Sequence, residues 1–256
     1  MKEFFVGYLP GIPPGIARTL RRAVTGLLFG AALLAIALTG SQRRFPPAFF
    51  EFAQVRDLEG IAEERPYPAL LVARPGIAGP EPAYSRYLLV SLGKHGAAEE
   101  MAGLAGKRVQ LRGKLIYRGG QTLVEVMPRT VSIAAAAAPP PAFKTDLGPA
   151  TLTGEIVDSK CYFGVMNPGE GKVHRDCATR CLAGGIPPAL IVRQAGGRAT
   201  VYVLADASGG PVPPDWAARR AARPITLHGR IVKAGDTLIL EADLGSVPMQ
   251  AKPARE

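Results

Sequence analysis

Cysteine, histidine and aromatic residues are scarce in this chain of 256 residues. It contains 3 cysteines, 3 histidines and 1 tryptophan, and aromatic residues make up 7% of the sequence. Three cysteines are too few for a disulfide scaffold, and an odd number leaves one thiol unpaired unless all three share a metal ion. The few aromatic rings provide little material for a platform on which single-stranded nucleic acid could stack.

Several functional signatures are missing as well. The sequence has no hydrolase triad pattern, no P-loop, no dinucleotide fingerprint and no C-x-x-C-H site for covalent haem, so it favours a non-enzymatic role. Acidic residues are outnumbered, with 21 Asp and Glu against 31 Lys and Arg and a net charge of +10. Nucleic acid, anionic lipid or a general preference for arginine would each account for this balance. We expect no nucleic-acid partner.

One long apolar run is present near the N-terminus. Residues 23–40 contain no charged side chain over 18 positions, which as a helix cover about 27 Å of the roughly 30 Å hydrocarbon core. Three arginines precede the run and two follow it, which are Arg18, Arg21, Arg22, Arg43 and Arg44. This asymmetry favours a cytoplasmic segment 1–22. The alternative is a cleaved signal peptide, although its charged region would be unusually long.

The sequence therefore predicts a single-pass protein of the inner (plasma) membrane, anchored through residues 23–40. The remaining residues would lie in the periplasm or outside the cell.

An internal repeat organises the rest of the chain. Residues 108–126 align without gaps on residues 224–242, and both segments alternate apolar and polar residues on either side of a glycine-containing turn. This pattern is typical of a β-hairpin, with Gly119–Gly120 and Gly235–Asp236 at the two turns. The residues expected to face a core are Leu111, Leu115, Leu123, Leu227, Ile231 and Leu238.

Each half of the chain shows about five short expected strands, with a short helical segment between the third and fourth. That order is typical of an OB-fold, although other small barrels would also fit. We therefore predict a mainly β protein with an N-terminal transmembrane helix followed by two OB-fold-like small β-barrels. The expected domains are residues 50–133 and 151–245, joined by an Ala/Pro-rich linker at 134–150.

The second half carries an insertion of 26 residues, within 158–188, that the first half lacks. It falls between the first two expected strands and contains every cysteine of the chain. If the segment 174–181 is helical, His174, Cys177 and Cys181 share one face, and Cys161 precedes them across a turn. A tetrahedral Cys3His site follows, for which zinc is the first choice; iron, an iron–sulfur cluster, copper and haem are alternatives.

The surroundings of these four residues suggest further roles. Lys172, Arg175 and Arg180 are expected to help keep the thiols deprotonated. Asp158 is interpreted either as an acceptor for a ligating histidine or as a turn residue. His95 and His228 are expected on the surface, and Trp216 in a packed position.

The stretch from about Thr153 to Val192 resembles a motif of poorly characterised bacterial envelope proteins with small OB-like domains. That motif combines D-x-x-C-Y-x-G with H-x-x-C-A-x-x-C-x-x-G-G-x-P, and Cys161, His174, Cys177 and Cys181 fall on its matching positions. The resemblance covers about one-sixth of the chain. It implies a shared loop and a shared ligand, and it brings no established activity.

Three functional hypotheses follow from the sequence. The first is a membrane-anchored accessory protein that binds a metal or redox centre and helps other envelope or membrane proteins to assemble a respiratory or metalloenzyme complex. The second is a thiol–disulfide redox protein, in which Cys161 pairs with Cys177 or Cys181. The third is a basic OB-type binding module without a metal.

Overall fold

The computed structural model describes residues 11–42, 48–74, 84–135, 144–194 and 198–246. By its internal contacts the chain forms two compact units, Met1–Pro46 and Pro47–Glu256. The first unit contains helix α1 (Pro14–Gln42), and the second contains all the strands.

Helix α1 is long and apolar enough to cross a membrane. It extends beyond the uncharged run 23–40 at both ends, so Arg18, Arg21 and Arg22 lie within the helix. At 29 residues it is longer than the ~20 residues that a membrane span requires. These three arginines thus lie on the first turns of the helix, directly before its apolar stretch.

The first β-barrel is a closed ring of five strands. Its strands are β2 (Arg56–Glu63), β3 (Ala69–Ala73), β4 (Tyr84–Val90), β5 (Arg108–Arg118) and β6 (Gln121–Val126), with helix α2 (Ala98–Met101) between β4 and β5. The ring closes because β6 pairs antiparallel with β5 and parallel with β4. Two short strands, β1 (Ala48–Phe50) and β7 (Ser132–Ala135), pair antiparallel with β5 near its C-terminal and N-terminal ends, respectively.

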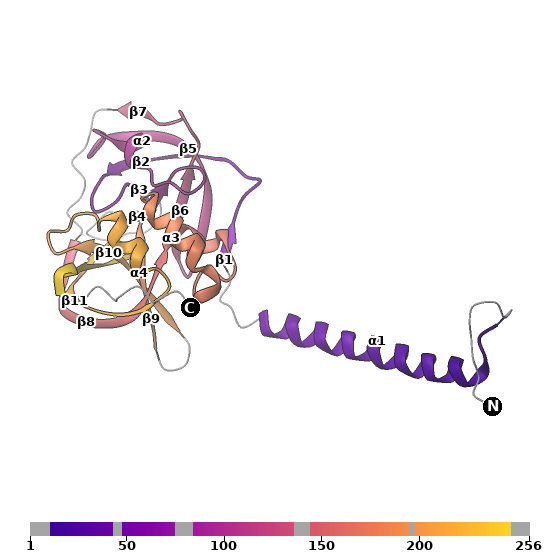
Figure 1. The fold of residues 1–256 in the computed structure, drawn as a ribbon. Coiled ribbons are helices and arrows are strands. Elements are labelled where there is room, and N and C mark those ends of the chain that lie inside the picture. The colour runs from indigo at the N-terminus through magenta and orange to yellow at the C-terminus, as the bar shows by residue number, and fades with distance from the viewer. Residues whose placement is uncertain (1–10, 43–47, 75–83, 136–143, 195–197, 247–256) are drawn as a thin grey trace. The chain divides into compact units, whose positions relative to one another are not determined.

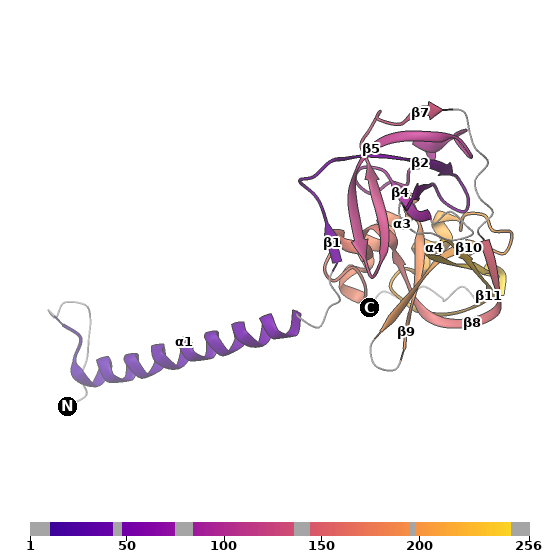
Figure 2. The same ribbon diagram turned by 180° about the vertical axis from the view of Figure 1, so that it is seen from behind.

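The second barrel repeats this order. Its strands are β8 (Lys144–Asp158), β9 (Pro188–Arg193), β10 (Ala199–Asp206), β11 (Pro224–Ala234) and β12 (Thr237–Ala242), with α4 (Pro214–Arg220) between β10 and β11. Again the last strand pairs parallel with the third, β12 with β10. Five strands closed in this order, with a helix between the third and fourth, confirm the predicted OB-like barrels. Figures 1 and 2 show the two barrels from opposite sides.

The repeat seen in the sequence is the β5–β6 hairpin of one barrel and the β11–β12 hairpin of the other. Its aligned glycines, Gly113 and Gly229, lie where the chain has no room for a side chain. A Cβ on either would collide with the carbonyl oxygen of the aligned glutamate, Glu125 or Glu241. The first hairpin turns through Gly119 and Gly120, both at positive φ, which is the conformation of a two-residue type I′ turn.

The expected core positions differ in how deeply they are buried. Leu111, Leu123 and Leu227 are fully buried, whereas Leu115 and Ile231 are partly buried and pack against the same cores. Leu238 is only half-buried, whereas the next two residues of β12, Ile239 and Leu240, are buried.

The described residues of the predicted linker 134–150 belong to strands. β7 includes residues 134 and 135, and β8 begins at Lys144 and pairs along its length with β11. The proline and alanine composition indicated a spacer, but Pro149 lies opposite Arg230 in this ladder. The second barrel therefore starts seven residues earlier than the expected boundary at 151. Residues 136–143 of the predicted linker lie outside the described part of the chain.

The two barrels share a hydrophobic core in addition to their own interiors. One cluster joins Leu88, Val90 and Leu123 of the first barrel to Val157 and Ile191 of the second. Five buried residues of the insertion also belong to it, namely Cys161, Tyr162, Phe163, Cys181 and Ile186. The insertion is therefore part of the seam between the barrels, which gives it a structural role as well.

Candidate metal centre

The insertion between β8 and β9 folds into three short helical elements. These are the wide turn η1 (Cys161–Val165), the turn η2 (Lys172–His174) and helix α3 (Arg175–Ala183). Cys161 opens η1, and Cys177 and Cys181 lie one helical turn apart on α3. His174 ends η2 just before α3, so it is not within the helix as the sequence predicted.

The three cysteines meet at one point. Their sulfur atoms all lie within 4.8 Å of one another, and Sγ of Cys161 is 4.0 Å from Sγ of Cys177. Cys161 and Cys181 are buried, at 3% and 2% exposure, while Cys177 is half-buried. All three are free thiols in the structure. The fold of the insertion thus brings Cys161 together with Cys177 and Cys181, which follow it by 16 and 20 positions.

His174 belongs to a second group, which it forms with Asp158 and Cys161. Its Nε2 lies 2.9 Å from Oδ2 of Asp158, and both side chains are buried. The other carboxylate oxygen of Asp158 accepts the backbone N–H of Cys161 at 2.8 Å. An ionised Asp158 would hold His174 with its proton on Nε2, leaving the lone pair of Nδ1 for another partner. Cys161 is common to both groups.

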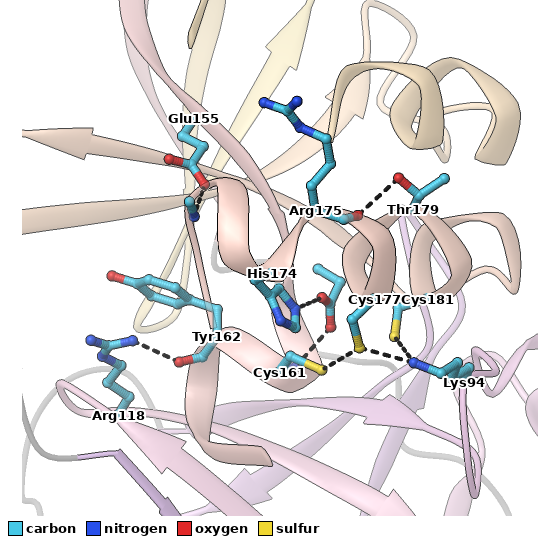
Figure 3. Close-up of polar contacts among 12 residues, drawn as sticks. Lys94, Arg118, Glu155, Cys161, Tyr162, His174, Arg175, Cys177, Thr179 and Cys181 are labelled. Carbon is cyan, nitrogen blue, oxygen red and sulfur yellow. Dashed lines mark hydrogen bonds and ion pairs between the residues drawn. The ribbon is translucent and has the colours of Figure 1, made fainter. Parts of the chain in front are cut away.

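A cation from the other barrel contacts the sulfur atoms. Nζ of Lys94, in the loop after β4, lies 2.9 Å from Sγ of Cys177 and 3.7 Å from Sγ of Cys181. Figure 3 shows the ammonium group beside these two sulfurs, with Cys161 on the far side of Cys177. Sequence reasoning missed this residue, because Lys94 precedes Cys177 by 83 positions and belongs to the first half of the repeat.

Hydrogen bonding between Cys161 and Cys181 shifts the pKa values of these two thiols in opposite directions. The bond from Cys161 lowers the pKa of Cys181 to about 7, helped by the charge of Lys94 and opposed by burial. Conversely, its hydrogen bond to Cys181, burial and the charge of Asp158 raise the pKa of Cys161 well above its usual range. The hydrogen bond to Cys177 raises the pKa of Lys94, so its ammonium form is favoured. Cys181 is therefore the more acidic thiol of this pair and Cys161 the less acidic one.

The sulfur geometry suits a thiophilic metal ion. A tetrahedral ion with Zn–S bonds of about 2.3 Å holds its sulfurs about 3.8 Å apart, close to the 4.0 Å between Cys161 and Cys177. A disulfide needs the sulfurs at about 2.05 Å, so any pair would have to move to form one. The three cysteines, and separately the group of Asp158, Cys161 and His174, could hold a metal ion.

The cations predicted around the site have other roles or positions. Arg175 donates from its guanidinium to the backbone oxygen of Ala222 at 3.1 Å, which ties α3 to the region after α4. Lys172 and Arg180 are exposed. Lys94 is the cation that hydrogen-bonds to sulfur instead, because docking of the two barrels brings its loop to the cysteines.

The remaining sequence expectations concern isolated residues. His95 and His228 are exposed as expected, and Nδ1 of His228 is 2.8 Å from the hydroxyl of Thr151. Trp216 packs against the core of the second barrel and donates from Nε1 to the carbonyl oxygen of Leu244 at 3.2 Å. Met166, considered as a haem ligand, is 44% exposed.

Comparison with protein-family models finds no family that matches the chain, and a search of curated proteins finds no match. The function is therefore inferred from the residues of the site and their geometry.

Proposed function

We propose that the protein binds a thiophilic metal ion, with zinc as the first choice, through Cys161, Cys177, Cys181 and His174. The observation that supports this proposal is the convergence of three sulfur atoms within 4.8 Å of one another. Thiolate and imidazole ligands together suit zinc best. Iron, an iron–sulfur cluster, copper and haem are the alternatives that metal analysis separates.

Asp158 would prepare His174 for this role. A ligating imidazole usually donates its other N–H to a carboxylate, which sets the tautomer and the ring orientation. Asp158 is placed to accept that N–H at 2.9 Å, and it also positions the backbone of Cys161. One buried carboxylate would thus orient two ligands from different elements.

We propose an accessory role in the bacterial envelope. Helix α1 would anchor the protein in the inner membrane, with the two barrels on the periplasmic side. The half-buried Cys177 would give other envelope or membrane proteins access to the bound ion, in support of assembling a respiratory or metalloenzyme complex. An alkaline phosphatase fusion at the C-terminus tests the topology: activity is expected, and an inactive but stable fusion would place the barrels in the cytoplasm.

Metal analysis of the full-length protein tests the site. The protein is purified in a mild detergent under anaerobic, reducing conditions, and its metal content is measured by mass spectrometry. About one ion per chain is expected, with loss in Cys177→Ser and His174→Ala. His228→Ala is the matched control, because His228 is exposed on β11, and it should retain the ion. A wild-type protein without stoichiometric metal would rule out the proposal.

Thiol counting distinguishes the rival redox function. The protein is denatured in chelator and titrated with a thiol reagent, with and without prior reduction. Metal binding predicts the same three thiols in both samples, since its ligands are thiolates that chelation releases. Two additional thiols after reduction would show a disulfide and favour the thiol–disulfide hypothesis.

A further inference from the structure

The loop 91–96 of the first barrel lies directly against the C-terminal end of α3. The backbone N–H of Gly96 donates to the carbonyl oxygen of Gly184 at 3.0 Å. A Cβ on Gly184 would collide with the carbonyl oxygen of Lys94, and a Cβ on Gly96 with that of Gly185. The two barrels therefore touch backbone to backbone beside the cysteines, which only glycine allows.

Lys160, a buried residue of the insertion, also hydrogen-bonds to the loop 91–96. Nζ of Lys160 donates to the carbonyl oxygens of Ser91 at 2.9 Å and Gly93 at 2.7 Å. It also forms an ion pair with Glu125 at 2.6 Å, with both side chains buried. The loop is thus held on both sides of Lys94, whose position over α3 is set by the packing of the two barrels.

Lys94 itself extends to the accessible side of the sulfur cluster. Its side chain is exposed, whereas Cys161 and Cys181 are buried and Cys177 is the cysteine that reaches the surface in part. The ammonium group contacts Cys177 at 2.9 Å and Cys181 at 3.7 Å. The exposed Lys94 side chain thus lies beside the one partly exposed cysteine of the cluster, and Figure 3 shows its nitrogen next to the sulfurs of Cys177 and Cys181.

We infer that Lys94 controls metal exchange at the cysteine cluster, so that the first barrel regulates the site of the second. This inference rests on the proposed metal-binding function. A divalent ion with three thiolates leaves one negative charge in excess, which the ammonium balances through a charge-assisted hydrogen bond. The same group covers Cys177 against incoming thiols and chelators. Because an exposed lysine side chain can change rotamer, Lys94 can move away from Cys177 without any movement of the barrels.

The experiment measures release of zinc from the full-length protein in detergent to an excess of a chromophoric chelator. Lys94→Gln removes the charge at nearly the same length, and Lys94→Arg retains the charge. Lys233→Gln is the control, because Lys233 is an exposed lysine on β11. We expect release from Lys94→Gln to be about tenfold faster, which equals about 1.4 kcal/mol and is the lower range for a hydrogen bond to a charged group. Lys94→Arg should stay within about threefold of wild type.

A spectroscopic readout separates this role from a purely structural one. With cobalt(II) in place of zinc, the thiolate-to-metal absorption should shift in Lys94→Gln, because a hydrogen bond to a ligating sulfur is lost. It should not shift in Lys233→Gln. A merely structural lysine would change the melting temperature without moving this band.

The possible results have separate meanings. If the wild-type protein does not retain zinc, the proposed metal-binding function fails. If wild type retains zinc but Lys94→Gln releases it at the wild-type rate with an unshifted cobalt band, the metal site stands and the control by Lys94 is refuted. Equal acceleration in Lys94→Arg and Lys94→Gln would also refute it, because the retained charge would then have no effect.

Discussion

Replacing Lys160 by methionine should weaken the seam between the barrels strongly. The Lys160 and Glu125 side chains are 3% and 6% exposed, and their charged atoms are 2.6 Å apart. Methionine retains most of the apolar stem but leaves the Glu125 carboxylate buried without its cation. Removing one partner of a buried pair typically costs about 3–5 kcal/mol. For a unit of this size, that corresponds to a fall in melting temperature of about 6–20 °C.

Thermal unfolding of the full-length, metal-free protein in detergent, followed by circular dichroism, measures this effect. The double variant Lys160→Met, Glu125→Gln removes both charges and should recover at least half of the loss, because the unpaired carboxylate is the main cost. Arg108→Gln is the matched control: its ion pair with Glu59 is exposed, so about 1 kcal/mol or less is expected. A fall of less than about 2 °C in Lys160→Met, or no recovery in the double variant, would refute the reasoning.

Three further predictions test the fold around the site. Gly184→Ala should lower the melting temperature by about 2–12 °C and speed zinc release, since its Cβ would displace the Lys94 carbonyl. The control Gly245→Ala should change neither quantity, because its Cβ would meet only Asp243 at 3.4 Å. Equal effects of the two substitutions would contradict this prediction. Tyr67→Phe should cost about 1–3 kcal/mol in urea unfolding, because the buried N–H of Val212 loses its 2.9 Å acceptor; an unchanged midpoint would contradict it. Alkaline carbonate extraction should leave the protein in the membrane pellet if α1 spans the bilayer, whereas release to the supernatant would exclude a spanning helix.

The strands and hairpins were predictable because their signals are local. Alternating residues in 108–126 and 224–242 indicated two hairpins, and the structure confirms that β5 and β11 begin at the aligned residues Arg108 and Pro224. The insertion was predictable for a similar reason: the first half of the chain served as an internal reference. β8 was not predicted across 144–150, because its regularity comes from pairing with β11 and not from its own composition.

The cysteines of the candidate site were predictable from their place in the chain. Their concentration in one insertion indicated a common partner, and the structure brings all three sulfurs together. The helical spacing also placed His174 beside Cys177 and Cys181, but the chain enters α3 through a separate turn, and Asp158 takes up the imidazole. The residue spacing does not reveal this buried carboxylate partner, because Asp158 lies at the end of β8, 16 positions before His174.

An apolar helix, two barrels of one design and a cysteine-bearing insertion in the second barrel could all be predicted from the order of the residues. These features follow from hydrophobic periodicity and from comparison within the chain. The contact of Lys94 of the first barrel with the cysteines of the second, and the hydrogen bonds from Lys160 to the loop that carries Lys94, depend on how the barrels pack. Packing across the shared core, and not proximity along the chain, brings these charged groups together in the seam.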